Sequence, residues 1–183
     1  MTADADADFG TVVYDLDGTL VRLAVDWDAV TREAAEAFAD AGIEVDDDLF
    51  AMFDAAQAYG LGDELEGLVS DHECRGAERS ERLPSCDRLA THEGRVGVCS
   101  LNSERACRLA LERHGVLEYV DAIVGRDSVA GRKPDPEPLL STLRRLDADP
   151  ADAVFVGDTE RDAETADRAG VAFRYVDGTP RKF

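Results

Sequence analysis

The sequence predicts an α/β protein, in which a parallel sheet lies between two layers of helices and a small all-helical domain is inserted near the start. From residue 84 onward, short apolar runs rich in β-formers alternate with helical stretches, and strands separated by single helices pair in parallel. Before that, helical patterns follow one another with no strand between them. A chain of 183 residues has room for both parts. We therefore expect a core formed by residues 1–21 and 84–183, and a helical insert at 22–83.

The first elements are one strand and the helices of the insert. An apolar run at residues 9–14 predicts the strand, which Gly18 ends. Apolar residues at helical spacing then predict three helices. These are expected at 28–42 with Asp28 as N-cap, at about 47–59, and from residue 63 into a polar stretch that reaches residue 81.

The second part of the chain alternates between the two periodicities. The expected order is a helix at 84–92, a strand at 96–100, a helix at 103–114, a strand at 122–124, a helix at 136–146, a strand at 153–156, a helix at 159–169 and a strand at 171–176. Parallel strands end at the same edge of a sheet, and ligands bind α/β proteins in the crevice outside that edge. Polar side chains that follow these strands are therefore candidates for one shared site.

Four of the predicted strands are followed by such side chains. Asp15 and Asp17 follow the first strand, where side chains two apart point the same way. Two carboxylates this close repel each other unless a cation or a proton lies between them. The other candidates are Ser100 and Asn102 after the second strand, Lys133 after the third, and Asp158 and Asp162 after the fourth.

These motifs and their order resemble the haloacid dehalogenase (HAD) superfamily of phosphohydrolases. The four motifs are DLDGTL at 15–20, a strand ending in Ser100, the pair Lys133-Pro134, and GDTERD at 157–162. The resemblance covers most of the chain outside the insert. It implies a Rossmann-like core and identifies residues 22–83 as an all-helical (C1-type) cap, with phosphoglycolate phosphatase-like enzymes as the nearest analogy.

The resemblance also implies a role for each candidate. Asp15 matches the nucleophile that forms an aspartyl-phosphate, and Asp17 matches the general acid and base. Asp158 matches a metal carboxylate, together with Asp15 and the backbone carbonyl of Asp17, and Asp162 supports the metal or the lysine. The groups expected to hold the phosphate are Thr19, Ser100, Asn102 and Lys133.

The chemistry of phosphate transfer supports the same expectation. A carboxylate that approaches an anionic phosphate ester is repelled unless a cation offsets the charge, and Mg²⁺ prefers oxygen ligands. Lysine is a compact point charge, and Lys133 is one of two lysines in a chain that otherwise uses arginine. We therefore expect a Mg²⁺-dependent phosphatase that hydrolyses a small phosphorylated metabolite.

Several alternatives remain open. A phosphomutase would pass the phosphoryl group to a second hydroxyl instead of water, and the core motifs do not separate the two. A dehalogenase is disfavoured, because a haloacid substrate needs no acid such as Asp17 to protonate its leaving group. A phospho-receiver domain is also disfavoured, because it would need neither DxDGT nor a helical insert. A catalytically silent binding protein is disfavoured because Asp15 is intact. A zinc site can be drawn from His72, Cys74, Cys86 and His92, but its spacing matches no common pattern.

The charge of the chain limits its partners. Forty acidic residues against twenty basic ones give a formal net charge of −20, which repels nucleic acid and anionic membranes. Acid-rich, lysine-poor composition resembles halophilic proteins, and we take halophily as a hypothesis. The start of the chain is acidic, no apolar run is long enough to span a membrane, and the four cysteines form no CxxC pair, so we expect a cytoplasmic protein with reduced thiols.

Arginines of the insert raise a last alternative. Arg22, Arg75, Arg79 and Arg82 could meet an anionic substrate. Solvated arginines that balance Glu73, Glu78 and Glu81 are the favoured interpretation. The sequence makes no prediction of oligomeric state or of the identity of the substrate.

Overall fold

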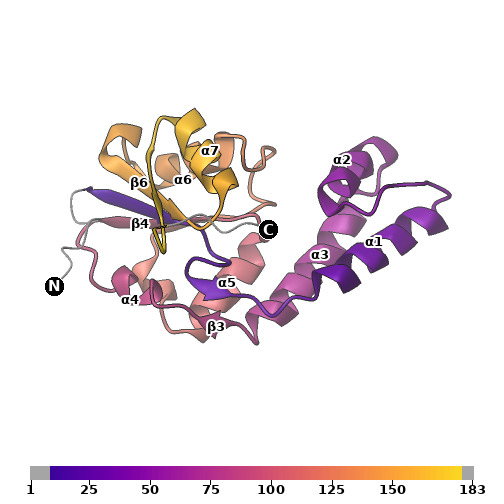
Figure 1. Cartoon of the computed structure of the whole chain (residues 1–183), viewed down its shortest axis with the longest axis horizontal. Coiled ribbons are helices and arrows are strands. Elements are labelled where there is room, and N and C mark those ends of the chain that lie inside the picture. Colours follow the sequence, from indigo (N-terminus) through magenta and orange to yellow (C-terminus); the bar gives the residue numbers. More distant parts are fainter. Residues whose placement is uncertain (1–8, 179–183) are drawn as a thin grey trace.

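The computed structural model describes residues 9–178. Figure 1 shows a sheet with helices above and below it, and a further group of helices that extends away from the sheet on one side. The elements are β1 (Thr11–Tyr14), β2 (Val21–Arg22), α1 (Trp27–Asp40), α2 (Leu49–Tyr59), α3 (Gly62–Ala77), β3 (Glu81–Arg82), α4 (Cys86–Leu89), β4 (Arg95–Cys99), α5 (Glu104–Arg113), η2 (Leu117–Tyr119), β5 (Ala122–Val124), α6 (Glu137–Leu146), η3 (Pro150–Asp152), β6 (Ala153–Gly157), α7 (Glu160–Ala169) and β7 (Ala172–Tyr175).

The sheet has five parallel strands in the order β5-β4-β1-β6-β7. The first strand therefore lies at its centre, with Thr11 aligned to Arg95 of β4 on one side and to Ala153 of β6 on the other. All four residues of β1 are buried, as expected of a parallel strand that is covered on both faces. The residues that follow β1 consequently leave the sheet at the middle of its carboxyl edge.

Two separate hydrophobic clusters cover the two faces of the sheet. Val12 and Tyr14 point to the face that packs against α4 and α5, and Val13 points to the opposite face, against α6 and α7. Large buried side chains such as Leu111 on one face and Phe155 on the other exclude water from both layers. The predicted α/β class with a three-layer core is thereby confirmed.

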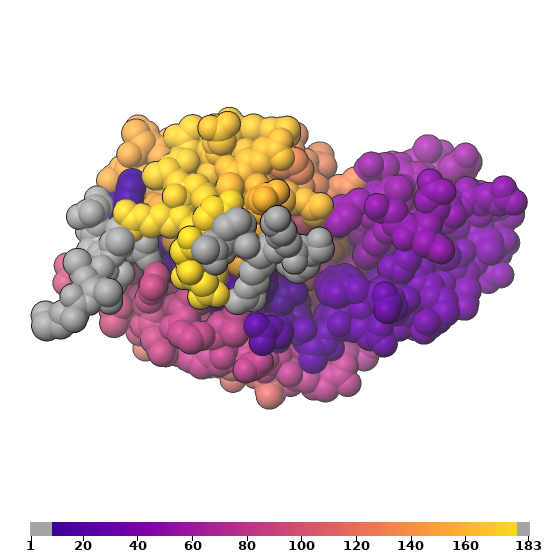
Figure 2. Space-filling view, in the orientation of Figure 1, coloured from indigo at the N-terminus to yellow at the C-terminus, as the bar shows by residue number. Residues whose placement is uncertain are grey.

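The three helices at the side share a core of their own. Val30, Phe38, Met52 and Val69 are among its buried residues, and they come from α1, α2 and α3 in turn. In Figure 2 this segment forms a lobe beside the rest of the molecule, coloured indigo to magenta. The longest helix, α3, runs back to the sheet and packs along α5, as Figure 1 also shows.

Three details differ from the sequence predictions. The N-cap of α1 is Asp26, whose carboxylate accepts from the Ala29 N–H, and not Asp28. The helix expected at 84–92 is reduced to the single turn of α4. The chain also enters and leaves the segment 22–83 through a ribbon of two antiparallel two-residue strands, β2 and β3. Strands this short have no periodicity, so the sequence pattern gave no sign of the ribbon.

Candidate active site

The candidate site begins at the tight turn that follows β1. The Asp15 N–H donates to the Val156 carbonyl at 2.9 Å, which extends the ladder between β1 and β6 by one residue. The N–H groups of Leu20 and Val21 then donate to the Leu16 carbonyl, which closes the turn. Within this turn, Gly18 has φ +84°, in the left-handed region. A Cβ atom at this position would also lie 2.2 Å from Asp158 Oδ2, so only glycine fits the turn.

Lys133 is the cation of the site, and its side chain is buried. Its Nζ donates to Asp15 Oδ1 at 2.7 Å, to Asp162 Oδ1 at 2.6 Å and to the Cys99 carbonyl at 3.3 Å. These contacts use all three donors of an ammonium group. Lys133 therefore joins the ends of β1 and β4 to the first turn of α7, which are far apart in the sequence.

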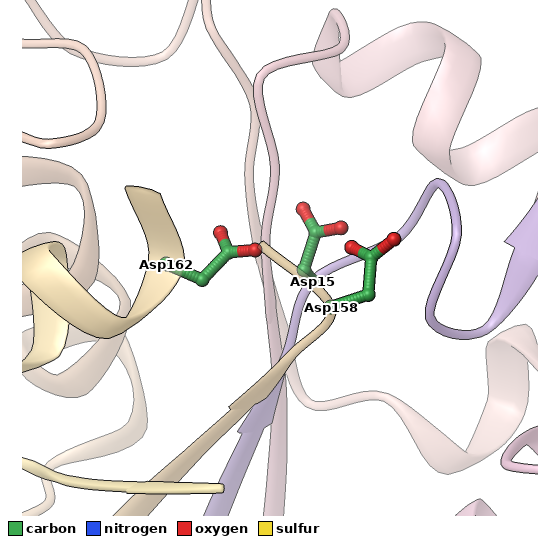
Figure 3. Close-up of side chains that lie close together, drawn as sticks. All are labelled: Asp15, Asp158 and Asp162. Atoms are coloured by element: carbon green, nitrogen blue, oxygen red, sulfur yellow. The ribbon is translucent and has the colours of Figure 1, made fainter. Parts of the chain in front are cut away.

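The three carboxylates of Asp15, Asp158 and Asp162 form one cluster. Each offers an oxygen atom within 4.8 Å of the others, and all three residues are buried. Figure 3 shows Asp15 between the other two, which extend from the start of α7 and the end of β6. Among residues 9–178 this is the only group of potential metal ligands of this kind, and it does not include His72, Cys74, Cys86 or His92.

Asp162 is already held by its neighbours within this cluster. Its Oδ2 accepts from the Thr159 N–H at 3.2 Å and from the Thr159 hydroxyl at 2.6 Å, while its own N–H donates back to that hydroxyl. This capping box starts α7. With Lys133 on Oδ1, both carboxylate oxygens of Asp162 have donors, and the residue fixes the lysine.

The pKa values of the two carboxylates that share Lys133 shift in opposite directions. Burial raises the pKa of Asp15 to about 8, against the lowering effect of Lys133, and the charge of Asp162 adds to the rise. Burial also acts on Asp162, but Lys133 and the Thr159 donors outweigh it and lower its pKa. The difference follows from the extra donors of Asp162. Further positive charge beside Asp15 would favour its ionised form.

Asp17 lies outside the cluster of three carboxylates. Its Oδ1 accepts from the Leu23 N–H at 2.8 Å, where the chain leaves for the helical segment. Burial raises the pKa of Asp17 to about 6. A carboxyl group with this pKa exchanges a proton readily near neutral pH, as a general acid and base must.

The other predicted phosphate-binding groups lie in two places. The Thr19 hydroxyl donates to Asp158 Oδ1 at 3.5 Å. The Ser100 hydroxyl donates to Asn102 Oδ1 at 3.0 Å and accepts from the Asn102 N–H at 3.1 Å. Asn102 Nδ2 donates to Glu73 Oε1 at 3.2 Å, so a residue of α3 reaches the loop after β4.

Comparison with known proteins shows the family of the chain. A family model for haloacid dehalogenase-like hydrolases matches residues 84–176. A phosphoglycolate phosphatase from Cereibacter sphaeroides is 36% identical over 182 residues, which cover 88% of this chain and 82% of the relative. The chain belongs to the haloacid dehalogenase-like hydrolase family. A more distant relative of this HAD-like hydrolase, the pyrophosphatase PpaX from Bacillus cereus, is 27% identical and covers 92% of this chain and 83% of its own.

Solved structures support the same fold for this HAD-like hydrolase. A putative phosphoglycolate phosphatase from Lactobacillus plantarum has a TM-score of 0.67 at 23% identity, covering 92% of this chain and 86% of its own. CbbY from Rhodobacter sphaeroides, solved with phosphate, has a TM-score of 0.66 at 20% identity, covering 95% and 87%. The family and the hydrolase class predicted from the motifs are confirmed, while the roles of the individual site residues stay predictions.

Sequence reasoning missed Glu73, which was expected to balance surface arginines. The residue is 0% exposed, and its carboxylate binds Arg126 of the loop after β5. The interpretation of Glu73 as a solvated acid is therefore wrong. One sign was present: Glu73 follows Leu65 and Val69 at intervals of four, on the buried stripe of α3. The other part of that interpretation fits the structure, because Arg22 forms an exposed ion pair with Glu81 at 3.2 Å.

Proposed function

We propose that this HAD-like hydrolase is a Mg²⁺-dependent phosphatase that cleaves small phosphorylated metabolites through an aspartyl-phosphate on Asp15. The observation that carries the proposal is the contact of Lys133 with Asp15 Oδ1 at 2.7 Å beside the buried carboxylate of Asp158. Lys133 binds one carboxylate oxygen, so Oδ2 is the atom that would attack phosphorus. A buried ammonium and a bound cation together offset the charge of a phosphate ester.

The residues of the site fit a magnesium ion. Carboxylate oxygens are the ligands that Mg²⁺ prefers, and those of Asp15 and Asp158 lie within 4.8 Å of each other. The resemblance adds the backbone carbonyl of Asp17 to this set. Asp162 supports the site through Lys133, because both of its oxygens already have donors. When bound, the ion would supply Lewis-acid stabilisation of the phosphoryl oxygens and lower the pKa of Asp15 below about 8.

The residues of the chain divide the reaction into two steps. Asp15 Oδ2 forms a bond to phosphorus while the bond to the ester oxygen breaks, and Asp17 gives its proton to that oxygen. Asp17, now ionised, takes a proton from water, whose oxygen forms a bond to phosphorus while the bond between phosphorus and Asp15 Oδ2 breaks. This step releases inorganic phosphate and restores the Asp15 carboxylate. To hold the phosphoryl oxygens, Lys133 turns one donor from the Cys99 carbonyl, its longest contact at 3.3 Å, to the phosphate, and the Ser100 hydroxyl turns its hydrogen away from Asn102 Oδ1.

The names of the relatives suggest which substrates to test first. The phosphoglycolate phosphatase of Cereibacter sphaeroides and the pyrophosphatase PpaX of Bacillus cereus are both named for small phosphorylated substrates. We include phosphoglycolate among the phosphate monoesters of a substrate panel, with pyrophosphate as a separate class. Release of inorganic phosphate distinguishes hydrolysis from the transfer that a phosphomutase would perform.

We further propose that residues 22–83 act as a cap over the site. Two contacts from α2 to the core support this. Asp54 forms an ion pair with Arg132, which is next to Lys133. The centre of the Phe50 ring lies 4.3 Å from the guanidinium carbon of Arg161, which is next to Asp162. Both contacts lie one residue from the catalytic cluster. A cap in this position excludes water from the phosphoryl group.

The experiment is a phosphate-release assay of the purified protein with the panel, with MgCl₂ and with EDTA. We expect Mg²⁺-dependent turnover of at least one phosphate monoester. Asp15→Asn should abolish turnover, since an amide is a poor nucleophile. Turnover that survives this substitution would exclude the covalent mechanism, and full activity in EDTA would exclude the metal.

The cysteines indicate the compartment in which the protein acts. All four cysteines are buried and free, which is typical of a reducing compartment, and we propose a cytoplasmic location. Among residues 9–178, none of the helices is long and apolar enough to cross a membrane.

The net charge of −20 favours high salt, so the assay is run at low and at molar KCl. An unfolding midpoint that does not rise with KCl would contradict the halophilic hypothesis.

A further inference from the structure

Glu73 connects the helical segment to the loop that carries Ser100. It lies near the end of α3 that packs along α5, and its carboxylate is wholly buried. Four hydrogen bonds hold the two oxygens. Arg126 and Asn102 Nδ2 donate to Oε1 at 2.6 and 3.2 Å, and the Ser103 N–H and Arg126 donate to Oε2 at 2.9 and 3.2 Å.

Arg126 holds this carboxylate in place. Its guanidinium binds Glu73 and Glu66 of α3, and donates as well to the Leu101 carbonyl at 2.8 Å. Burial alone would lower the pKa of Arg126, but the two glutamates outweigh it and raise the pKa. A planar guanidinium that binds carboxylates with two parallel bonds fixes direction as well as distance.

The contacts continue from Glu73 to the predicted phosphate-binding group. Asn102 Nδ2 is bound to Glu73, which orients the amide so that its Oδ1 faces the Ser100 hydroxyl at 3.0 Å. The Ser103 N–H, also bound to Glu73, is at the start of α5. The loop of residues 100–103 is thus held at two points by one carboxylate from outside the core.

We propose that Glu73 is a positioning residue for phosphate binding: through Asn102 it fixes the position of Ser100 Oγ, whose hydrogen turns from Asn102 Oδ1 to a phosphoryl oxygen when phosphate binds. The inference rests on the proposed phosphatase function, and extends it: the helical segment supplies a buried group that sets the geometry of the catalytic loop. Removing a carboxylate from water costs free energy even when four donors bind it in the protein. If position 73 served packing alone, an apolar residue would fill it without that cost.

Glu66 offers a matched control. It binds the same Arg126 guanidinium, at 2.7 and 3.0 Å, but makes no hydrogen bond to the loop of residues 100–103. Glu66→Gln and Glu73→Gln each remove one carboxylate from Arg126, and only Glu73→Gln also replaces an acceptor of the loop with an amide donor. A purely structural role of Glu73 would lower the Tm of both variants, more at the buried Glu73, and would leave kcat/KM and phosphate affinity unchanged in both.

The test measures kcat/KM for the best substrate of the panel, the affinity for inorganic phosphate by calorimetry with Mg²⁺, and the Tm of each variant. We expect Glu73→Gln to lower kcat/KM by about 10–100-fold, as displacement of a positioned group does, and to weaken phosphate binding. Glu66→Gln should lower the Tm and leave kcat/KM and phosphate affinity unchanged. In the Asn102→Ala background, Glu73→Gln should have little further effect on kcat/KM and phosphate affinity, because the hydrogen bond from Asn102 to Glu73 is already lost.

Two outcomes would overturn the proposal. One is an equal effect of Glu66→Gln and Glu73→Gln on kcat/KM and phosphate affinity, and the other is Glu73→Gln with wild-type values of both. If Glu73→Gln does not fold, Glu73→Asp carries the test, because it keeps the charge opposite Arg126 but is too short to reach both Asn102 and Ser103. Phosphate affinity needs no turnover, so a wild-type protein that binds phosphate but hydrolyses nothing would contradict the proposed function alone.

Discussion

Two buried cations of this protein, Lys133 and Arg126, each lie between two carboxylates. Lys133 binds Asp15 and Asp162 inside the core, and Arg126 joins the core to Glu66 and Glu73 of α3. The charge balance is the same in both clusters, but the geometry differs. A lysine gathers acceptors around one point, whereas an arginine binds planar groups at its edges. The comparison shows one arrangement of charges used at a candidate catalytic centre and again at a contact between two parts of the molecule.

The partners of the two cations differ in how firmly they are held. Asp162 is fixed by Thr159, but Asp15 is buried with a pKa raised to about 8 and lies next to Asp158. Glu73, by contrast, has donors on both oxygens. The cluster at Lys133 therefore has room for one more positive charge, whereas the cluster at Arg126 is balanced within the protein. Four predictions test this difference.

The largest expected effect is on stability, at Arg126. Arg126→Met leaves two glutamates without their cation, one of them fully buried. Removal of one partner from a buried ion pair costs about 3–5 kcal/mol. Urea denaturation with and without Mg²⁺ should show this loss in both conditions. A loss that Mg²⁺ restores would mean that the two clusters are not distinct.

At Lys133 we expect a loss of catalysis in addition to the loss of stability that removal of a buried cation causes. Lys133→Met removes the ammonium that contacts Asp15 and would hold a phosphoryl oxygen. Loss of one such group lowers kcat by about 10²–10³-fold. The measurement is kcat at saturating Mg²⁺, with urea denaturation as the control. Lys133→Arg should not restore activity, because a guanidinium cannot meet three acceptors around one point, and full activity in this variant would contradict the comparison.

The raised pKa of Asp15 predicts a dependence of stability on pH in the metal-free protein. Its folded pKa of about 8 lies above the usual 3.8, so the folded state binds a proton that the unfolded state releases. This contribution to stability is complete below pH 3.8 and is lost as pH rises through 8. Asp15→Asn removes it, and the difference in unfolding free energy between variant and wild type should change by up to about 1.4 kcal/mol per pH unit in this window. A difference that is constant from pH 5 to pH 8 would contradict the shift.

The smallest effect is expected at an exposed ion pair. Arg22 and Glu81 join β2 to β3, and their side chains are 54% and 68% exposed. Arg22→Ala should change the free energy of unfolding by less than about 1 kcal/mol, because water and salt screen such a pair. The KM for each substrate of the panel should also be unchanged. A rise in KM would restore Arg22 as a candidate substrate contact.

Much of the fold could be predicted from local pattern alone. The strand at Ala122–Val124 and the alternation of helices and strands after residue 84 agree with the structure, because buried strands and amphipathic helices have distinct periods. The parallel order of the strands also predicted that Asp15, Lys133 and Asp162 converge, and hydrogen bonds now join them. These features depend on residue type and on spacing along the chain.

Only the tertiary structure decided which buried acid binds which cation. Glu73 and Arg126 are 53 residues apart, and Lys133 and Asp15 are 118 apart. Motifs led to the second pair, whereas nothing in the periodicity of α3 indicated that a glutamate on its buried stripe would meet an arginine after β5. A periodic pattern reports that a side chain faces inward, but the identity of its partner depends on how separate elements pack. The sequence therefore determined that Asp15, Lys133 and Asp162 meet at one edge of the sheet, and the packing of α3 against α5 and the loop after β5 determined the contact between Glu73 and Arg126.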